Sequence, residues 1–166
     1  RSTVLNAANI DAFRQGLVKL GYKEGQNFEL AYRSSDGRDA RFPGLASELV
    51  RLKVDLILTR GTPAALAAKR ATRDIPVVMA ASGDPVGSGI VTSLARPGGN
   101  VTGLSSGITE SYPKRVELLG ELLPGLRRIA VILNMANPVI PPQWSIVEAS
   151  ARSLGITPQL LDVRRP

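Results

Sequence analysis

Short apolar runs alternate with amphipathic segments along most of this 166-residue chain, and this alternation limits the fold more than any other feature. The apolar runs occupy residues 54–59, 75–80, 100–104, 128–133 and 159–163. The helical patterns occupy residues 9–20, 39–52, 111–123 and 142–154, with a further helix after residue 62. Strands that alternate with helices favour parallel sheets covered by helices. The sequence therefore predicts an α/β fold.

The order of the segments predicts two lobes, neither of them whole. Residues 27–33 alternate apolar and polar side chains, as a half-buried strand does, yet the chain begins with a helical pattern where such a sheet normally begins with a strand. The alternation restarts after residue 104 with only two strands, and a two-stranded sheet buries too little to stand alone. We therefore expect residues 1–104 to form one lobe without its first strand, residues 105–166 to begin a second lobe, and the chain to be a fragment.

The amino-acid composition closes off most catalytic and metal sites. The chain has no cysteine and no histidine, which excludes disulfides, thiol nucleophiles, the Ser-His-Asp triad and most transition-metal sites. The 21 Lys and Arg residues exceed the 14 Asp and Glu residues by seven, but they are scattered over the polar faces of the predicted helices without interleaved aromatic residues. We expect no metal, no cofactor and no nucleic-acid partner.

The junction between the run at 54–59 and the helix after it predicts an anion site. Thr62 is a favourable N-cap residue, and Pro63 suits the first helical position. Such a helix start presents free backbone N–H groups and the positive end of the helix dipole, which favour a carboxylate or a phosphate. Gly61, like Gly83 after the next predicted strand, would let a ligand approach the backbone closely, and Ala64 opens a run of strong helix formers with little side-chain bulk.

Polar residues follow two other predicted strands. Ser82, Gly83 and Asp84 follow the run at 75–80, and Asn134 follows the run at 128–133. Ligands of open parallel sheets bind at the carboxyl ends of the strands. We therefore expect these residues to converge with the turn at Thr62.

Several blocks of the sequence, in the same order, resemble the ABC transporter substrate-binding proteins of the tryptophan/tyrosine-binding type. The blocks are FRQGL at 13–17 with LGYKEGQN at 20–27, GTPAALAAK at 61–69, GDPV at 83–86, RPGGNVTG at 96–103, and Asn134 with NP at 137–138. The resemblance covers nearly the whole chain. It implies a type I periplasmic-binding-protein fold, in which two lobes close by a hinge over a ligand in the cleft. Members of this family with known ligands bind aromatic amino acids or related small molecules.

The resemblance turns the candidate residues into a predicted ligand site. We expect the Thr62 hydroxyl and the N–H groups of the following turn to hold a ligand carboxylate, Asp84 to pair with an ammonium group, and Asn134 to add hydrogen bonds from the second lobe. The predicted ligand-binding residues are Gly61, Thr62, Pro63, Ala64, Ser82, Gly83, Asp84 and Asn134.

Structural roles explain several of the same residues equally simply. Thr62 before Pro63 is a routine helix start, Asp84 before a proline is a common turn opener, and Asn134 fits a loop cap. Trp144 lies at helix-face spacing with other apolar residues, which favours core packing over ligand stacking. We expect Tyr22 and Tyr32 to be packing residues as well.

The leading functional hypothesis is a non-catalytic solute-binding component of an ABC importer, located in the periplasm or elsewhere outside the cytoplasm. Its predicted partners are a small-molecule ligand, which is an amino acid or a related carboxylate, and a membrane permease. The alternative is a ligand-sensing module of a regulator with the same fold, although no helix-turn-helix segment is visible in the sequence. Exposed apolar surface at the missing first strand is also expected to promote self-association of the chain.

Overall fold

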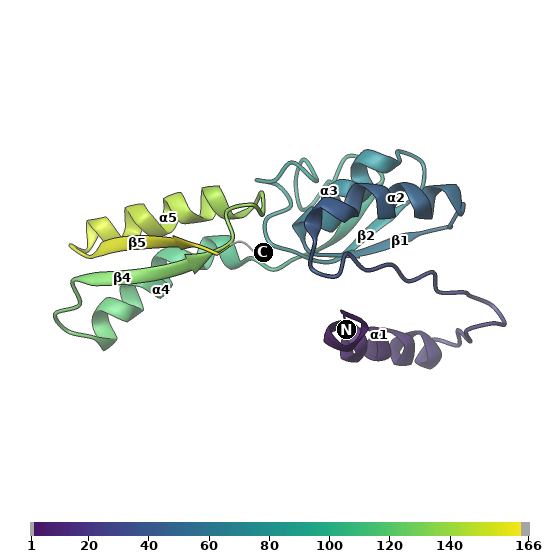
Figure 1. Ribbon diagram of the computed structural model, residues 1–166, viewed down its shortest axis with the longest axis horizontal. Coiled ribbons are helices and arrows are strands. Elements are labelled where there is room, and N and C mark those ends of the chain that lie inside the picture. Colours follow the sequence, from purple (N-terminus) through teal and green to yellow (C-terminus); the bar gives the residue numbers. More distant parts are fainter. Residues whose placement is uncertain (1, 164–166) are drawn as a thin grey trace.

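The structure is a computed structural model that describes residues 2–163, and it contains two parallel sheets (Figure 1). In the first sheet the order is β1-β2-β3, and each neighbouring pair is parallel. In the second sheet β4 pairs with β5, also in parallel. The predicted α/β class with parallel sheets is confirmed. The strands are β1 (Ile57–Arg60), β2 (Val77–Ser82), β3 (Val101–Ser105), β4 (Arg128–Leu133) and β5 (Thr157–Asp162).

Helices cover one face of the first sheet, and other helices pack against the second sheet. In the N-terminal part, α2 and α3 lie together over the first sheet, and in the C-terminal part α4 packs against α5 (Figure 1). The first helix, α1, lies apart from the first sheet in the same view. The helices are α1 (Ser2–Lys19), α2 (Phe42–Arg51) after a 3-10 turn at Asp39–Arg41, α3 (Thr62–Ala71), α4 (Ile108–Leu122) and α5 (Ile140–Ser153).

Each part has a hydrophobic core of its own. Alternate residues of β1 and β2 point under α3, where Ala65 and Ala68 are at most 1% exposed. Because alanine side chains are short, α3 lies close against the sheet. In the C-terminal part, Trp144 packs against a cluster that includes Val147 and Ile156. The predicted packing role of Trp144 is confirmed.

The predicted strand at residues 27–33 is wrong. Phe28 makes one isolated bridge, to Glu24, and the residues after it are extended without a strand beside them in the described part of the chain. A β-strand needs a neighbour to satisfy its backbone groups, and the alternating pattern alone cannot supply one. The Tyr22 ring lies edge-on to that of Phe28, with 6.3 Å between the ring centroids, but Tyr22 is 45% exposed and belongs to neither core.

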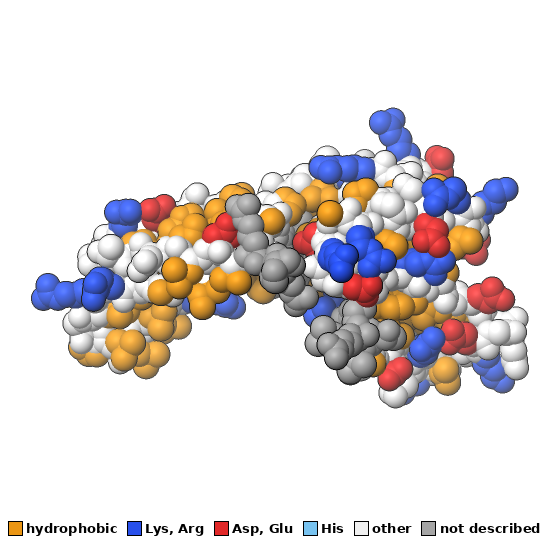
Figure 2. Space-filling view, in the orientation of Figure 1, with side chains coloured by type: hydrophobic (Ala, Val, Ile, Leu, Met, Phe, Trp, Pro, Cys, Tyr) orange, Lys and Arg blue, Asp and Glu red, His pale blue; other side chains and the backbone are white. Residues whose placement is uncertain are grey.

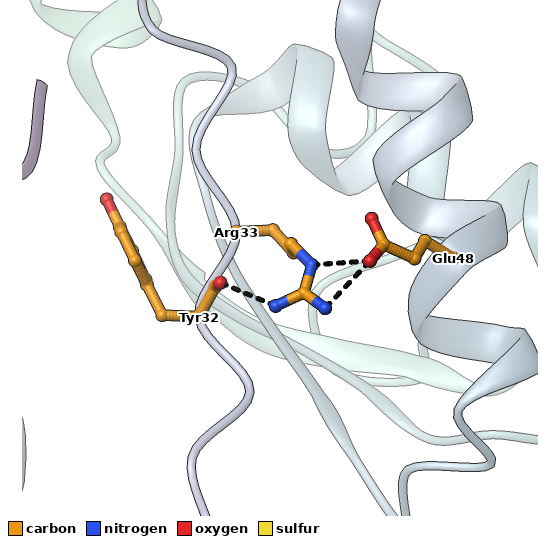
Figure 3. A network of polar contacts seen from close by, with 3 residues as sticks. All are labelled: Tyr32, Arg33 and Glu48. Carbon is orange, nitrogen blue, oxygen red and sulfur yellow. Dashed lines mark hydrogen bonds and ion pairs between the residues drawn. The ribbon is translucent and has the colours of Figure 1, made fainter.

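An ion pair fastens this extended segment to α2 (Figure 3). The Arg33 guanidinium donates through Nε and a terminal nitrogen to Glu48 Oε1, at 2.9 and 2.7 Å, and its other terminal nitrogen donates to the Tyr32 carbonyl. The hydrogen bond from Arg33 lowers the pKa of the Glu48 carboxyl from its usual value. The segment is therefore positioned by a charged contact rather than by a strand ladder.

Large apolar side chains remain exposed on the described part of the chain. Leu104 is 67% exposed on β3, Leu122 is 74% exposed on α4, and Ile132 is 68% exposed on β4. Figure 2 shows hydrophobic side chains gathered over α4 and β4. None of the described helices has the length and apolar character needed to cross a membrane.

Candidate functional site

The candidate site lies at the carboxyl edge of the first sheet, where two polar turns meet. Arg60 at the end of β1 pairs with Ala81 in β2, and the Gly61 N–H donates to the Ala81 carbonyl at 2.8 Å. The turn that begins at Gly61 therefore lies beside the turn that begins at Ser82. Two of the predicted clusters converge as expected from the sheet topology.

The start of α3 differs by one residue from the prediction. Gly61 is the N-cap residue, with φ of +90°, and Thr62 and Pro63 are the first two helical residues. A non-glycine residue rarely adopts this φ, so the turn requires Gly61. The prediction of Thr62 as the N-cap is wrong, and no side chain caps the helix.

The Thr62 hydroxyl bridges the two turns. Its oxygen accepts a hydrogen bond from the Gly83 N–H at 3.2 Å and lies 3.2 Å from the Ser82 hydroxyl. Thr62 is 2% exposed and Ser82 is 1% exposed. Because its hydroxyl is engaged by these two groups, Thr62 fixes the relation between the turns.

The start of α3 presents backbone N–H groups at this edge of the sheet. The first turn of a helix has backbone N–H groups without an intrahelical acceptor. Pro63 contributes no such group, because proline has no backbone N–H. The Ala65 N–H is bonded to the Gly61 carbonyl at 3.2 Å, whereas the Ala64 N–H lies in the unsatisfied first turn at a half-buried residue. An anion placed here would face the Ala64 N–H and the positive end of the helix dipole.

Asp84 opens a tight turn next to this helix start. Its Oδ1 accepts a hydrogen bond from the Gly87 N–H at 2.8 Å, and its carbonyl accepts one from the Ser88 N–H at 3.0 Å. The turn-opening role predicted for Asp84 is confirmed. The carboxylate is half-buried, and its negative charge lies in the loop directly after Gly83.

The loop after β4 brings the C-terminal part against the same edge. Asn134 Oδ1 accepts a hydrogen bond from the Ala136 N–H at 3.0 Å, so its predicted loop-capping role is confirmed. The loop ends at Val139, whose two methyl groups lie 3.3 Å from the position that a Cβ on Gly83 would occupy. Periodicity and motif spacing did not point to Val139, because a lone apolar residue in a loop carries no such signal.

A hollow lies beside the candidate site, between α2, α3 and the loop after β4. It has a volume of about 440 Å³. Pro63 is the one predicted site residue in its wall. The wall also contains Phe42, Leu66, Arg70 and Pro138. Among residues 2–163, no three acidic side chains gather in a way that would hold a metal ion.

These features define the class of protein. Two parallel α/β units, with polar turns at the carboxyl edge of one sheet and a loop of the other unit against it, have the fold of type I periplasmic binding proteins. The family model described as "ABC transporter substrate binding protein" matches residues 6–165. The chain belongs to this family.

Several proteins of known structure or curated name are similar to the chain. A tyrosine-binding protein of Clostridioides difficile is 38% identical over 140 residues, which are 82% of this chain and 40% of that protein. The crystal structure of a conserved domain protein from Vibrio cholerae superposes with a TM-score of 0.80 at 34% identity, and covers 90% of this chain and 50% of the other. An ABC domain from Streptococcus pneumonia in complex with L-Trp superposes at 0.78 with 32% identity and the same coverage. The chain thus spans half or less of these relatives' lengths.

Proposed function

We propose that this protein is the solute-binding component of an ABC importer and binds a small carboxylate-bearing ligand, an aromatic amino acid being the first candidate. The family supports the solute-binding role, and the relatives named for tyrosine binding and solved with L-Trp support the ligand class. The role is non-catalytic, the location is outside the cytoplasm, and the partner that receives the ligand is a membrane permease. The family favours this role over the ligand-sensing module of a regulator.

The observation that carries the proposal is the pairing of a helix N-terminus with a carboxylate at one sheet edge. The backbone N–H groups at the start of α3 hold the ligand carboxylate. Among them, the Ala64 N–H belongs to a more exposed residue than the Thr62 N–H does. Asp84, in the neighbouring turn, pairs with the ligand ammonium group. The negative end of a zwitterionic ligand thereby meets the positive end of the helix dipole, and its positive end meets the Asp84 carboxylate.

The remaining predicted residues shape the site. Gly61 and Gly83 keep the backbone free of side-chain bulk, and Ser82 with Thr62 holds the two turns together. Asn134 adds hydrogen bonds from the loop after β4, whose far end, Val139, lies against Gly83. In this proposal residues 1–104 form the first lobe, residues 105–166 belong to the second, and the ligand lies between them.

Calorimetric titration with a set of matched ligands tests the proposal. L-Tryptophan has both charges, tryptamine lacks the carboxylate, and indole-3-propionate lacks the ammonium group. We expect L-tryptophan to bind most tightly, with each lost charge weakening binding about tenfold or more, which corresponds to roughly 1.4 kcal/mol. Equal affinity for tryptamine and L-tryptophan would show that the carboxylate is not recognised.

Variants separate the two charged contacts. Asp84→Asn removes the negative charge, so it should weaken binding of L-tryptophan and leave binding of indole-3-propionate unchanged. Asp74→Asn is the matched control, because Asp74 is an exposed aspartate in the loop before β2, at the other end of the sheet. If Asp84→Asn and Asp74→Asn behave alike with L-tryptophan, Asp84 has no role in recognition.

A further inference from the structure

The absence of a side chain at Gly83 matters for packing against Val139 rather than for backbone conformation. It is absent from the glycines with positive φ, so an L-residue fits its conformation without strain. A Cβ there would instead lie 3.3 Å from both Val139 methyl groups and 3.5 Å from Thr62 Oγ1. Such a separation is shorter than ordinary van der Waals contact between carbon atoms. A side chain at residue 83 would therefore press against the Val139 methyl groups.

Hydrogen bonds hold Gly83 in place from both sides. Its N–H donates to Thr62 Oγ1 at 3.2 Å, and its carbonyl accepts from the Ser106 hydroxyl at 3.2 Å. The Ser106 N–H in turn donates to the Ser82 carbonyl at 2.8 Å. Ser106 lies in the connection from β3 to α4. The backbone at Gly83, against which Val139 packs, is therefore hydrogen-bonded to the segment that joins the two lobes.

Hydrogen bonds also hold Val139 in place, on the other side of its contact with Gly83. Its N–H donates to Asn137 Oδ1 at 3.3 Å, and the Asn137 N–H donates to the Asn134 carbonyl at 3.1 Å. The Met135 N–H donates to Asp162 Oδ1 at 3.0 Å, which ties the loop to β5. Val139 itself is 7% exposed. A loop braced in this way cannot retract from Gly83 without moving the C-terminal part.

We propose that Gly83 and Val139 form a steric stop that sets how closely the second lobe approaches the carboxyl edge of the first sheet. The side-chain volume at residue 83 then determines the width of the closed cleft. Thr62 is a positioning residue of this stop, because its hydroxyl holds the Gly83 N–H. The consequence for ligand affinity rests on the proposed function, whereas the contact itself does not.

A distance measurement between the lobes tests the stop without any ligand. The chain has no cysteine, so Arg73→Cys and Arg127→Cys introduce two unique sites for spin labels. Both residues are exposed and precede the strands β2 and β4, at the ends away from the contact, where a change in lobe angle produces a large displacement. Pulsed electron-paramagnetic-resonance spectroscopy then reports the distribution of distances between the labels.

Size substitutions on the two sides of the contact should compensate each other. Gly83→Val should shift the distance distribution and broaden it, because its side chain collides with Val139. Adding Val139→Ala should return the distribution toward that of the unsubstituted chain. An unchanged distribution in Gly83→Val, or a double variant that stays as far from the original as Gly83→Val, would overturn the proposal.

A disulfide test keeps the proposal falsifiable if Gly83→Val does not fold. Cβ atoms joined by a disulfide lie about 3.5–4.5 Å apart, which suits residues in direct contact. Gly83→Cys with Val139→Cys should form a disulfide on mild oxidation, measured by mass spectrometry. Gly83→Cys with Ala136→Cys, in the exposed part of the same loop, is the control. If the two pairs oxidise equally slowly, the contact does not exist in solution.

Ligand titration separates this inference from the proposed function. If Gly83→Val reduces the closed form to about a tenth of the molecules, apparent affinity falls about tenfold, and Val139→Ala restores it. A chain that shows the compensating distances but binds no amino acid refutes the proposed ligand and leaves the stop intact. A chain that binds L-tryptophan with the same affinity in all these variants refutes the role of the stop in binding.

Discussion

The Thr62 hydroxyl offers the sharpest test of how the site is built, through the isosteric change Thr62→Val. This substitution keeps the shape of the side chain and removes its oxygen. The Gly83 N–H and the Ser82 hydroxyl then each lose the partner that they have at 3.2 Å. An unsatisfied buried polar group costs about 1–3 kcal/mol. Gly83 is only half-buried, so we expect a total loss of about 2–3 kcal/mol in the free energy of unfolding.

The measurement is urea denaturation followed by far-UV circular dichroism. In thermal denaturation the same loss should lower the Tm of the N-terminal part by several degrees. Thr62→Ser is the control, because it retains the hydroxyl and should cost about 0.8 kcal/mol for the lost methyl group. Amide exchange supplies a local readout, in which the Gly83 N–H should lose protection in Thr62→Val alone. Equal stability of Thr62→Val and Thr62→Ser would refute the view that this hydroxyl holds the turns together.

Three further predictions concern stability and association. Asn100→Ala removes hydrogen bonds from the Asn100 amide to the carbonyls of Thr72 and Ile75 and should cost about 1–2 kcal/mol by urea denaturation; a loss below about 0.3 kcal/mol would contradict this. The lowered pKa of Glu48 means that its pair with Arg33 contributes stability above the ordinary glutamate pKa of 4.5 and loses it as pH falls further. Glu48→Gln should therefore be less stable than the unsubstituted chain at pH 7 and match it at low pH, whereas a constant difference from pH 7 to pH 3 would exclude this pair as the cause. The exposed side chain of Ile132 should support concentration-dependent self-association, which Ile132→Lys reduces in light scattering; a monomer at all concentrations would refute it.

Periodicity predicted the elements that pack against a neighbour. The run at 128–133 is β4 with the predicted bounds: its pairing with β5 satisfies the backbone, and Ile129 and Val131 pack against the C-terminal core. The run at 27–33 has an equally regular pattern but no strand beside it among residues 2–163. A sequence pattern records which side chains are apolar, whereas a strand also requires a partner backbone, which the pattern does not specify.

The site was predictable as a location more than as a set of contacts. The rule that parallel strands end at one edge correctly brought the turns at Gly61 and Ser82 together. The bond between Thr62 and Ser82 joins residues twenty positions apart, and the contact between Gly83 and Val139 joins the loop after β2 to the loop after β4. Contacts of this kind depend on tertiary packing, so neither motif nor spacing could indicate them.

The central claim, that an amino acid binds at the start of α3 beside Asp84, is tested most directly by NMR titration of the chain with L-tryptophan. Amide shifts locate a ligand even when binding is weak. We predict saturable shifts at the amides of Ala64, Gly83 and Asp84, with smaller shifts when tryptamine replaces L-tryptophan. Shifts confined to Phe42 and Leu66 in the neighbouring hollow, or no saturable shifts at all, would contradict the claim.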